Sequence, residues 1–315
     1  SIAYILTESL INDLDYINTL RTPRFEEILD YKYTDLERGD IGRKLKVDNI
    51  LHGSILKEKN TLKLSFELLD INLGKVLWSD TWSDHFNNSN NIRNHILQSL
   101  LSLFSMEMPQ QLADSLSEEM TKNSDALEAY YNGKYCSDYL KSKEDIENGK
   151  NLLEKAVELD PNFVEAYYLY GLSCQRQGSY EAARSAFLDG QEIAETKNNI
   201  QGLAHIYKGI SVLDCALGKF KEAKKNIEKA LKIQLQFNNN TFEAMLRIDY
   251  AGVLNSLHKT DLSIEQNKQS NTLLKNLEDD RLLAISTIRL ADTYLVQGDY
   301  TQSITYAKIS LGIFR

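Results

Sequence analysis

The second half of the chain repeats a pattern of small, aromatic and apolar residues every 40 positions. Glycine occupies positions 178, 218 and 298, and His258 takes the remaining step. A second set follows two places later, and two sets of mostly small residues come after it: Tyr180, Phe220, Thr260 and Tyr300; Ala183, Ala223, Ser263 and Ser303; Gly190, Ala230, Ser270 and Ser310. A fixed period of this length predicts a solenoid of helix pairs, in which each pair buries its apolar face against the next.

The first part of the chain has a different pattern, which switches between helical spacing and strict alternation. Residues 3–17, 35–46 and 91–107 space their apolar residues as helices do. Between them, Leu62, Leu64, Phe66 and Leu68 alternate with polar residues, and runs at 48–57 and 75–83 flank this strand across polar turns. We therefore expect an α/β domain with a three-stranded antiparallel meander and helices, followed by an all-α solenoid. The expected boundaries are residues 1–108 for the first domain, 109–123 for a polar connector and 124–315 for about five repeats, with the 40-residue period running from 164.

The repeats resemble tetratricopeptide repeats. Residues 164–195 carry the spacing of that family, with Tyr167, Tyr170-Gly171, Gly178, Tyr180, Ala183, Phe187 and Gly190, and Asp160-Pro161 precedes them as a helix-start signal. The ordinary period of the family is 34 residues. The longer period here predicts helices of about 16–18 residues, with polar turns at Asn198-Asn199, Asn238-Asn239 and Glu278-Asp279. Thr260 and Asn267 replace aromatic or apolar residues, so the repeat at 244–283 is expected to be the weakest packed.

The first domain resembles the TolB-like amino-terminal domain of bacterial signalling proteins over residues 3–107. The resemblance rests on an ordered set within residues 41–82: Leu45 and Val47, then Leu51 with Gly53-Ser54, then Leu68 to Asp70, Gly74 and Trp78. The strand that precedes the first helix in that family is missing here. A TolB-like domain followed by repeats that open with Tyr130, Gly133 and Tyr135 is similar to the regulatory half of bacterial class III adenylyl cyclases and Ser/Thr kinases. The resemblance implies an output domain before Ser1, and the last helix, cut near Phe314-Arg315, predicts further sequence.

In such arrays the first helix of each repeat lines a binding groove. Placing this sequence on that spacing gives a mixed set of apolar, aromatic and charged candidates for binding a protein or peptide. The candidate groove residues are Tyr130, Lys134, Tyr168, Leu172, Arg176, His205, Lys208, Val212, Ile248 and Asn255, with Glu165 and Met245 beside them.

Composition and charge exclude several other functions. The net charge of −9 argues against nucleic-acid binding, and no apolar run approaches the length of a membrane helix. Five scattered histidines and three cysteines (136, 174 and 215) lack metal-ligand spacing, and no nucleotide-binding or nucleophile motif is present. We therefore expect no catalysis, metal or cofactor in these residues. Free thiols indicate a reducing compartment, hence the cytoplasm, with an extracytoplasmic (periplasmic) location as the alternative.

Three interpretations of function remain open from the sequence. The first is a non-catalytic regulatory part of a bacterial signalling protein, which could act through homodimer geometry. The second is the effector-binding half of a transcriptional regulator. The third is a stand-alone envelope scaffold. The identity of the partner does not follow from the sequence.

Overall fold

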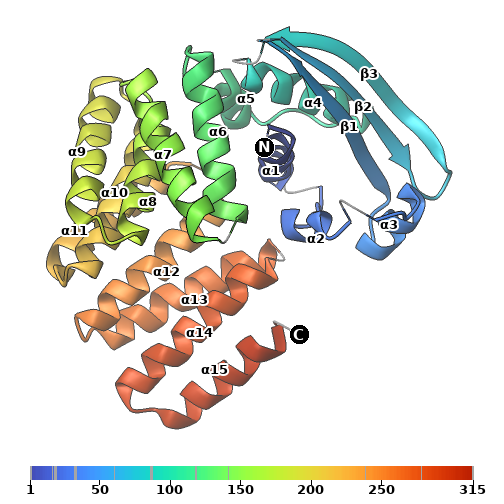
Figure 1. Ribbon diagram of the computed structural model, residues 1–315. Helices are drawn as coiled ribbons and strands as arrows, with labels where there is room; N and C mark the ends of the chain where they lie inside the picture. The colour runs from blue at the N-terminus through green and yellow to red at the C-terminus, as the bar shows by residue number, and fades with distance from the viewer. Residues whose placement is uncertain are drawn as a thin grey trace. The chain divides into compact units, whose positions relative to one another are not determined.

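The computed structural model describes residues 2–15, 17, 20–31, 34–59, 61–85, 88–117, 119–140, 142–237, 239–277 and 279–313 (Figure 1). Ser1 and Phe314-Arg315, and Asn238 and Glu278 of the predicted polar turns, lie outside these ranges. The chain divides into two compact units, Ser1–Pro161 and Asn162–Arg315. The first helix pair of the array therefore belongs to the first unit.

A three-stranded antiparallel sheet with the order β1-β2-β3 confirms the predicted meander. The central strand buries one face, because Leu62, Leu64, Phe66 and Leu68 are at most 7% exposed while the alternating Lys63 and Glu67 face solvent. The strands run β1 Asn49–Glu58, β2 Thr61–Asp70 and β3 Lys75–His85.

Gly53 in β1 permits a close approach between the paired strands. It lies opposite Phe66, and a Cβ atom at this position would come within 2.3 Å of the Phe66 ring. The one shift in register lies elsewhere, between Leu68 and Leu69 of the β2–β3 pair. The glycine is therefore required by the aromatic ring across the ladder.

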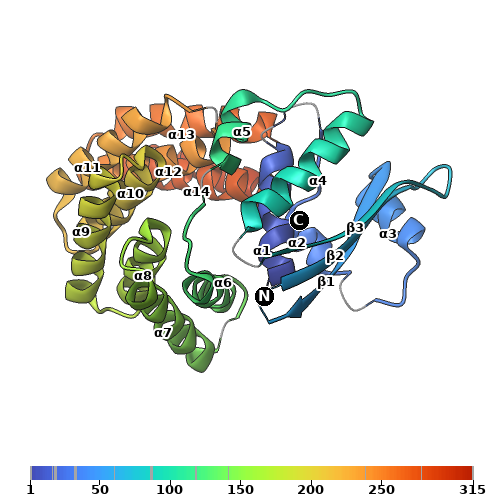
Figure 2. The ribbon, with the colours of Figure 1, turned by 90° about the horizontal axis from the view of Figure 1, so that it is seen from above.

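Helices cover the buried face of the sheet, with α1 and α4 on the same side (Figures 1 and 2). Asp13 of α1 is 5% exposed and accepts two hydrogen bonds from Arg93 of α4, at 2.5 and 2.8 Å. The predicted connector contains a helix of its own, α5, whose Leu112 and Leu116 are buried. The helices of this unit are α1 Ile2–Asp15, α2 Phe25–Leu29, α3 Arg38–Leu45, α4 Ser89–Leu103, α5 Gln110–Ser117, α6 Ser124–Tyr139 and α7 Lys143–Leu159.

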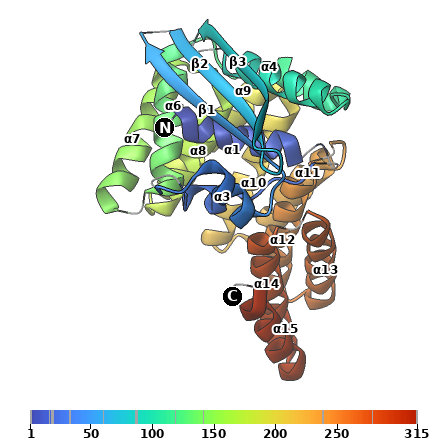
Figure 3. The same ribbon diagram turned by 90° about the vertical axis from the view of Figure 1, so that its right-hand side faces the viewer.

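The second unit consists of four consecutive helix pairs, the last two of which are seen side by side in Figure 3. Second helices begin at 180, 220, 260 and 300, and first helices at 200, 240 and 280, as the 40-residue period predicts. Only α8 departs from it, beginning at Val164 rather than at 160, because residues 161 and 162 form a turn. The pairs are α8 Val164–Arg176 with α9 Tyr180–Thr196, α10 Ile200–Ala216 with α11 Phe220–Gln234, α12 Asn240–Ser256 with α13 Thr260–Asn276, and α14 Asp280–Gln297 with α15 Tyr300–Ile313.

The repeated glycines mark the turn inside each pair. Gly178, Gly218 and Gly298 adopt φ values of 78°, 72° and 86°, and His258 adopts 54° at the same step. This left-handed conformation is open to glycine without the steric cost that a Cβ atom brings. The turn between pairs carries a second repeated signal, because Asn199, Asn239 and Asp279 each cap the helix that follows with a side-chain oxygen.

Small residues on the second helices let neighbouring helices pack closely. Ala183, Ala223 and Ser263 are fully buried, and so are Ala230 and Ser270. The largest apolar cluster of this unit runs from Val164 of α8 to Val253 of α12. A smaller cluster of Ala244, Ile248, Leu274 and Leu283 joins α12 and α13 to α14.

Candidate functional site

The candidate residues of the second unit lie on the first helices α8, α10 and α12, and some of them contact one another across these helices. The aromatic rings of Tyr168 and His205 have centroids 5.2 Å apart, and those of His205 and Phe242 are 4.1 Å apart. Each ring comes from a different helix, so the three form a row across α8, α10 and α12. We call this surface of α8, α10 and α12 the first-helix face. It includes the residues one turn further along each helix.

Lys208 ties the same three helices together by charge. Its Nζ lies 3.3 Å from Oδ2 of Asp249 on α12, and it shares a hydrogen bond with Tyr168 on α8. Only 12% of the Lys208 side chain is exposed. Burial opposes the charge, but Tyr168 and Asp249 outweigh it and raise the pKa of Lys208. The ammonium group therefore stays charged, and it links α10 to α8 and α12.

His205 is neutral in this environment. Burial and the nearby Lys208 charge lower the pKa of its imidazole to about 4. Its Nδ1 is buried and has no hydrogen-bond partner among the described residues. A neutral ring between Tyr168 and Phe242 acts as an apolar spacer.

The part of the first-helix face that stays accessible is a shallow strip. Leu172 and Val212 are half-buried, and Arg176 is exposed at the end of α8. The next position of this 40-residue series is Gly252, where an added Cβ would meet no atom within 4 Å. We define the strip as Leu172, Arg176, Val212 and Gly252. It offers two apolar side chains, open space at a helical glycine and one cation.

The remaining candidates are engaged inside the fold. Ile248 is 7% exposed in the smaller apolar cluster, and Asn255 donates to Thr293 at 2.8 Å. Glu165 accepts a hydrogen bond from Asn199, and Met245 is half-buried.

On the first helix pair, the chain itself occupies the predicted face. Lys134 of α6 bonds to Glu8 of α1 at 2.7 Å and to Asp138 at 2.8 Å, while Tyr130 is 8% exposed. The ring of Tyr4 in α1 contacts that of Tyr135, with centroids 5.0 Å apart. Helix α1 therefore covers the surface that the sequence assigns to a partner at this pair.

Sequence reasoning missed Phe242, Asp249 and Gly252. Asp249 lies one position beyond the predicted Ile248, so the spacing alone pointed to its neighbour. Gly252 had a detectable signal, because it continues the series Leu172 and Val212 and sits in mid-helix, where glycine is disfavoured.

No group of three or more His, Cys, Asp or Glu among the described residues could hold a metal ion. His95 lies 2.8 Å from Asp80 on the exposed side of α4 and β3, and its hydrogen bond lowers the pKa of that carboxyl. Within the described part of the chain, no helix has both the length and the apolar character needed to cross a membrane.

Comparison with known families identifies the first repeats of the array. Family models described as tetratricopeptide repeat match residues 137–163 and 152–185. The chain carries tetratricopeptide repeats, and these give it a protein-interaction or scaffold role. No curated protein sequence matches the chain significantly.

A solved structure of TPR-like repeats has a similar solenoid fold. A putative kinesin light chain from Podosopora anserina with nearly identical TPR-like repeats is 13% identical, with a TM-score of 0.50. The match covers 62% of this chain and 97% of that one. BtubC from P. vanneervenii is 16% identical, covers 60% of this chain and 89% of its own, and has a TM-score of 0.47.

Proposed function

We propose that this chain is the non-catalytic, partner-binding part of a bacterial multi-domain signalling protein, and that its array binds a protein or peptide at the first-helix face. The strip of Leu172, Arg176, Val212 and Gly252 carries the proposal. Leu172, Val212 and Gly252 are half-buried and Arg176 is exposed, so these residues stay partly accessible. The resemblance of residues 3–107 to TolB-like domains supports the signalling context.

The chemistry of the strip indicates the mode of binding. Leu172 and Val212 provide apolar contact. The open space at Gly252 admits a side chain of the bound segment or a close approach of its backbone. Arg176 can pair with a carboxylate at one end. A segment with one or two apolar anchors and an acidic residue fits this arrangement.

A charge placed on the strip tests the proposal. Peptides are selected from a random display library on the whole wild-type chain, and their affinities are measured by fluorescence anisotropy. We expect Val212→Glu to weaken them about tenfold or more, because a carboxylate would be desolvated in the contact. The matched control is Leu188→Glu on α9, where the side chain is already 52% exposed. Peptides that bind V212E as tightly as wild type would show that the strip is not the site.

A further inference from the structure

The third helix pair of the array, α12–α13, is polar where the two pairs before it are apolar or small. At four steps of the 40-residue series it carries polar side chains in place of aromatic, aliphatic or small ones. These are Arg247 for Tyr167 and Tyr207, Ser263 for Ala183 and Ala223, Asn267 for Phe187 and Ile227, and Ser270 for Gly190 and Ala230. The last three side chains are 0% exposed, so the polar groups lie inside the array.

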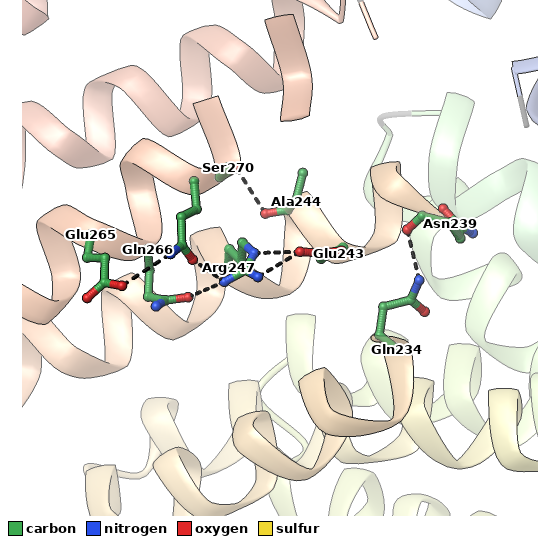
Figure 4. A network of polar contacts seen from close by, with 9 residues as sticks. Gln234, Asn239, Glu243, Ala244, Arg247, Glu265, Gln266 and Ser270 are labelled. Atoms are coloured by element: carbon green, nitrogen blue, oxygen red, sulfur yellow. Dashed lines mark hydrogen bonds and ion pairs between the residues drawn. The ribbon is translucent and has the colours of Figure 1, made fainter. Parts of the chain in front are cut away.

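Hydrogen bonds hold the two helices of this pair together (Figure 4). Arg247 of α12 donates to Gln266 at 2.7 Å and Gln269 at 2.5 Å on α13, and to Glu243 at 2.8 Å on its own helix. Its side chain and that of Glu243 are 13% and 15% exposed. Ser270 donates to the carbonyl of Ala244 at 3.1 Å. These groups satisfy one another, so α12–α13 stays intact as a pair.

The buried polar groups between this pair and α14–α15 have fewer hydrogen-bond partners than they need. Three side chains of the pair converge on Thr293 of α14. Ser263 lies 3.0 Å from its Oγ1, and the amide nitrogens of Asn255 and Asn267 donate to the same oxygen at 2.8 and 3.4 Å. Thr293 also donates to the backbone carbonyl of Arg289, so four groups surround one hydroxyl that can bond to three.

Two amide oxygens in this cluster are left over. Oδ1 of Asn255 and Oδ1 of Asn267 are buried and have no hydrogen-bond partner among the described residues. Turning either amide would exchange its oxygen for an NH₂ group and leave another buried polar atom unsatisfied. A buried polar site of this kind holds water where two or more groups can bond to it.

The apolar core is also divided at this point. The large cluster extends through Phe242, Leu246 and Val253 of α12 and so joins the third pair to the second. Between the third and fourth pairs lies the small cluster around Ile248, Leu274 and Leu283, and α14 also buries Ala284, Leu290 and Ala291. Beside it lies the polar layer of Asn255, Ser263, Asn267 and Thr293.

We propose that this polar layer binds buried water at Asn255 and Asn267, and that it is the joint at which α14–α15 separate from the rest of the array. Water that already bonds the amides lowers the cost of opening, because this part of the contact is hydrated before the pairs separate. The third pair remains attached to the second. Among the first helices, opening moves α14 and leaves α8, α10 and α12 in place. The joint is therefore separate from the proposed binding at Leu172 and Val212.

Native-state hydrogen exchange of the whole chain tests the joint. We expect amides of α14 and α15 to exchange as one unit, with a common opening constant about tenfold or more larger than that of α10 and α11. Fraying from the chain end instead gives a graded loss of protection from α15 inward. Equal protection from α10 to α15, or a smooth gradient, would overturn the joint.

Two variants act on the joint in opposite directions. Asn267→Ile restores the residue type of Ile227 and should slow exchange of α14–α15 about tenfold, with α10–α11 unchanged. Thr293→Val removes the shared hydroxyl and should speed the same amides. The mirror variant Ile227→Asn should create a new exchange boundary between α11 and α12. Failure of both joint variants to change α14–α15 selectively, in chains that retain wild-type circular dichroism, would contradict the proposal.

The bound water has a direct test. A high-resolution crystal structure should show a water within hydrogen-bonding distance of both amide oxygens. A dry layer in which the two asparagines bond directly to each other would rule out the hydrated site.

Discussion

At the scale of single residues, His258 shows how one side chain can occupy a backbone position made for glycine. Its φ of 54° matches the turn that Gly178, Gly218 and Gly298 form in the other pairs. A side chain in this region costs about 1–2 kcal/mol, because its Cβ approaches the carbonyl oxygen that follows. The turn still forms, since Lys259 bonds to Leu254 across it at 2.8 Å.

Replacing this residue should therefore stabilise the protein. We expect His258→Gly to raise the free energy of unfolding by about 1 kcal/mol in urea titrations, net of the added freedom of the unfolded chain. The reverse change, Gly218→His, introduces the same strain at φ 72° and should lower it by a similar amount. Identical effects of the two substitutions would contradict the role of the turn.

The lowered pKa of His205 predicts a pH dependence of stability. In the folded state its pKa is about 4, against 6.5 in the unfolded chain, so the unfolded state binds the proton more readily. The contribution of His205 to stability is then constant above about pH 6.5 and falls as the pH drops from 6.5 towards 4. The expected loss from pH 7.5 to 5 is about 2 kcal/mol.

His205→Phe keeps an aromatic ring between Tyr168 and Phe242 and removes the titration. Urea unfolding of this variant should lose about 2 kcal/mol less than wild type over the same pH interval. If both proteins lose the same amount, His205 does not carry the effect.

At the scale of elements, local sequence signals determine where the helices begin and end, whereas the packing differs from one pair to the next. Asn199, Asn239 and Asp279 begin α10, α12 and α14 by capping them, and turn glycines end α8, α10 and α14. What differs between the pairs is the contact surface. It is apolar between α8 and α11 and increasingly polar from α12 onward.

Two glycines inside first helices should respond to substitution in opposite ways. Gly252 in α12 has open space around it, so Gly252→Ala should stabilise by about 0.5–1 kcal/mol through helix propensity. A Cβ at Gly209 in α10 would lie 2.5 Å from the Phe187 ring, so Gly209→Ala should destabilise. Thermal unfolding of both variants measures the difference, and stabilisation by G209A would refute the close packing.

At the scale of the whole molecule, the second unit contains a core of its own. Both apolar clusters described for it lie between Val164 and Ile313. The division of the chain falls at Pro161, inside the run of repeats rather than at the predicted connector of residues 109–123. The boundary predicted at residues 109–123 therefore stays a prediction about where the chain divides into folding units.

The fragment 162–315 should fold alone, because its buried side chains pack against one another. We expect a helical circular-dichroism spectrum and a cooperative unfolding transition. The fragment 124–315, which begins at the predicted boundary, is the comparison. Loss of helicity in the shorter fragment but not in the longer one would favour the sequence-based boundary.

Much of the fold followed from periodicity. Alternation of Leu62, Leu64, Phe66 and Leu68 predicted β2, and the 40-residue series predicted the helix pairs and their turns. The short helix α2 and the helix α5 within residues 109–123 were missed, because short or polar segments carry a weak periodic signal. The tetratricopeptide family was correct, whereas the TolB-like resemblance and the signalling context stay predictions.

The candidate surface shows where sequence information ends. Periodicity determines which side of a helix a residue occupies, because that depends only on rotation per residue. It does not determine what the side chain meets across a gap of 40 positions. Only the tertiary structure decided that Lys208 pairs with Asp249, that α1 covers Lys134, and that Asn255 and Asn267 share the hydroxyl of Thr293. Each of these depends on distances between helices, which neighbouring side chains set by their size and charge.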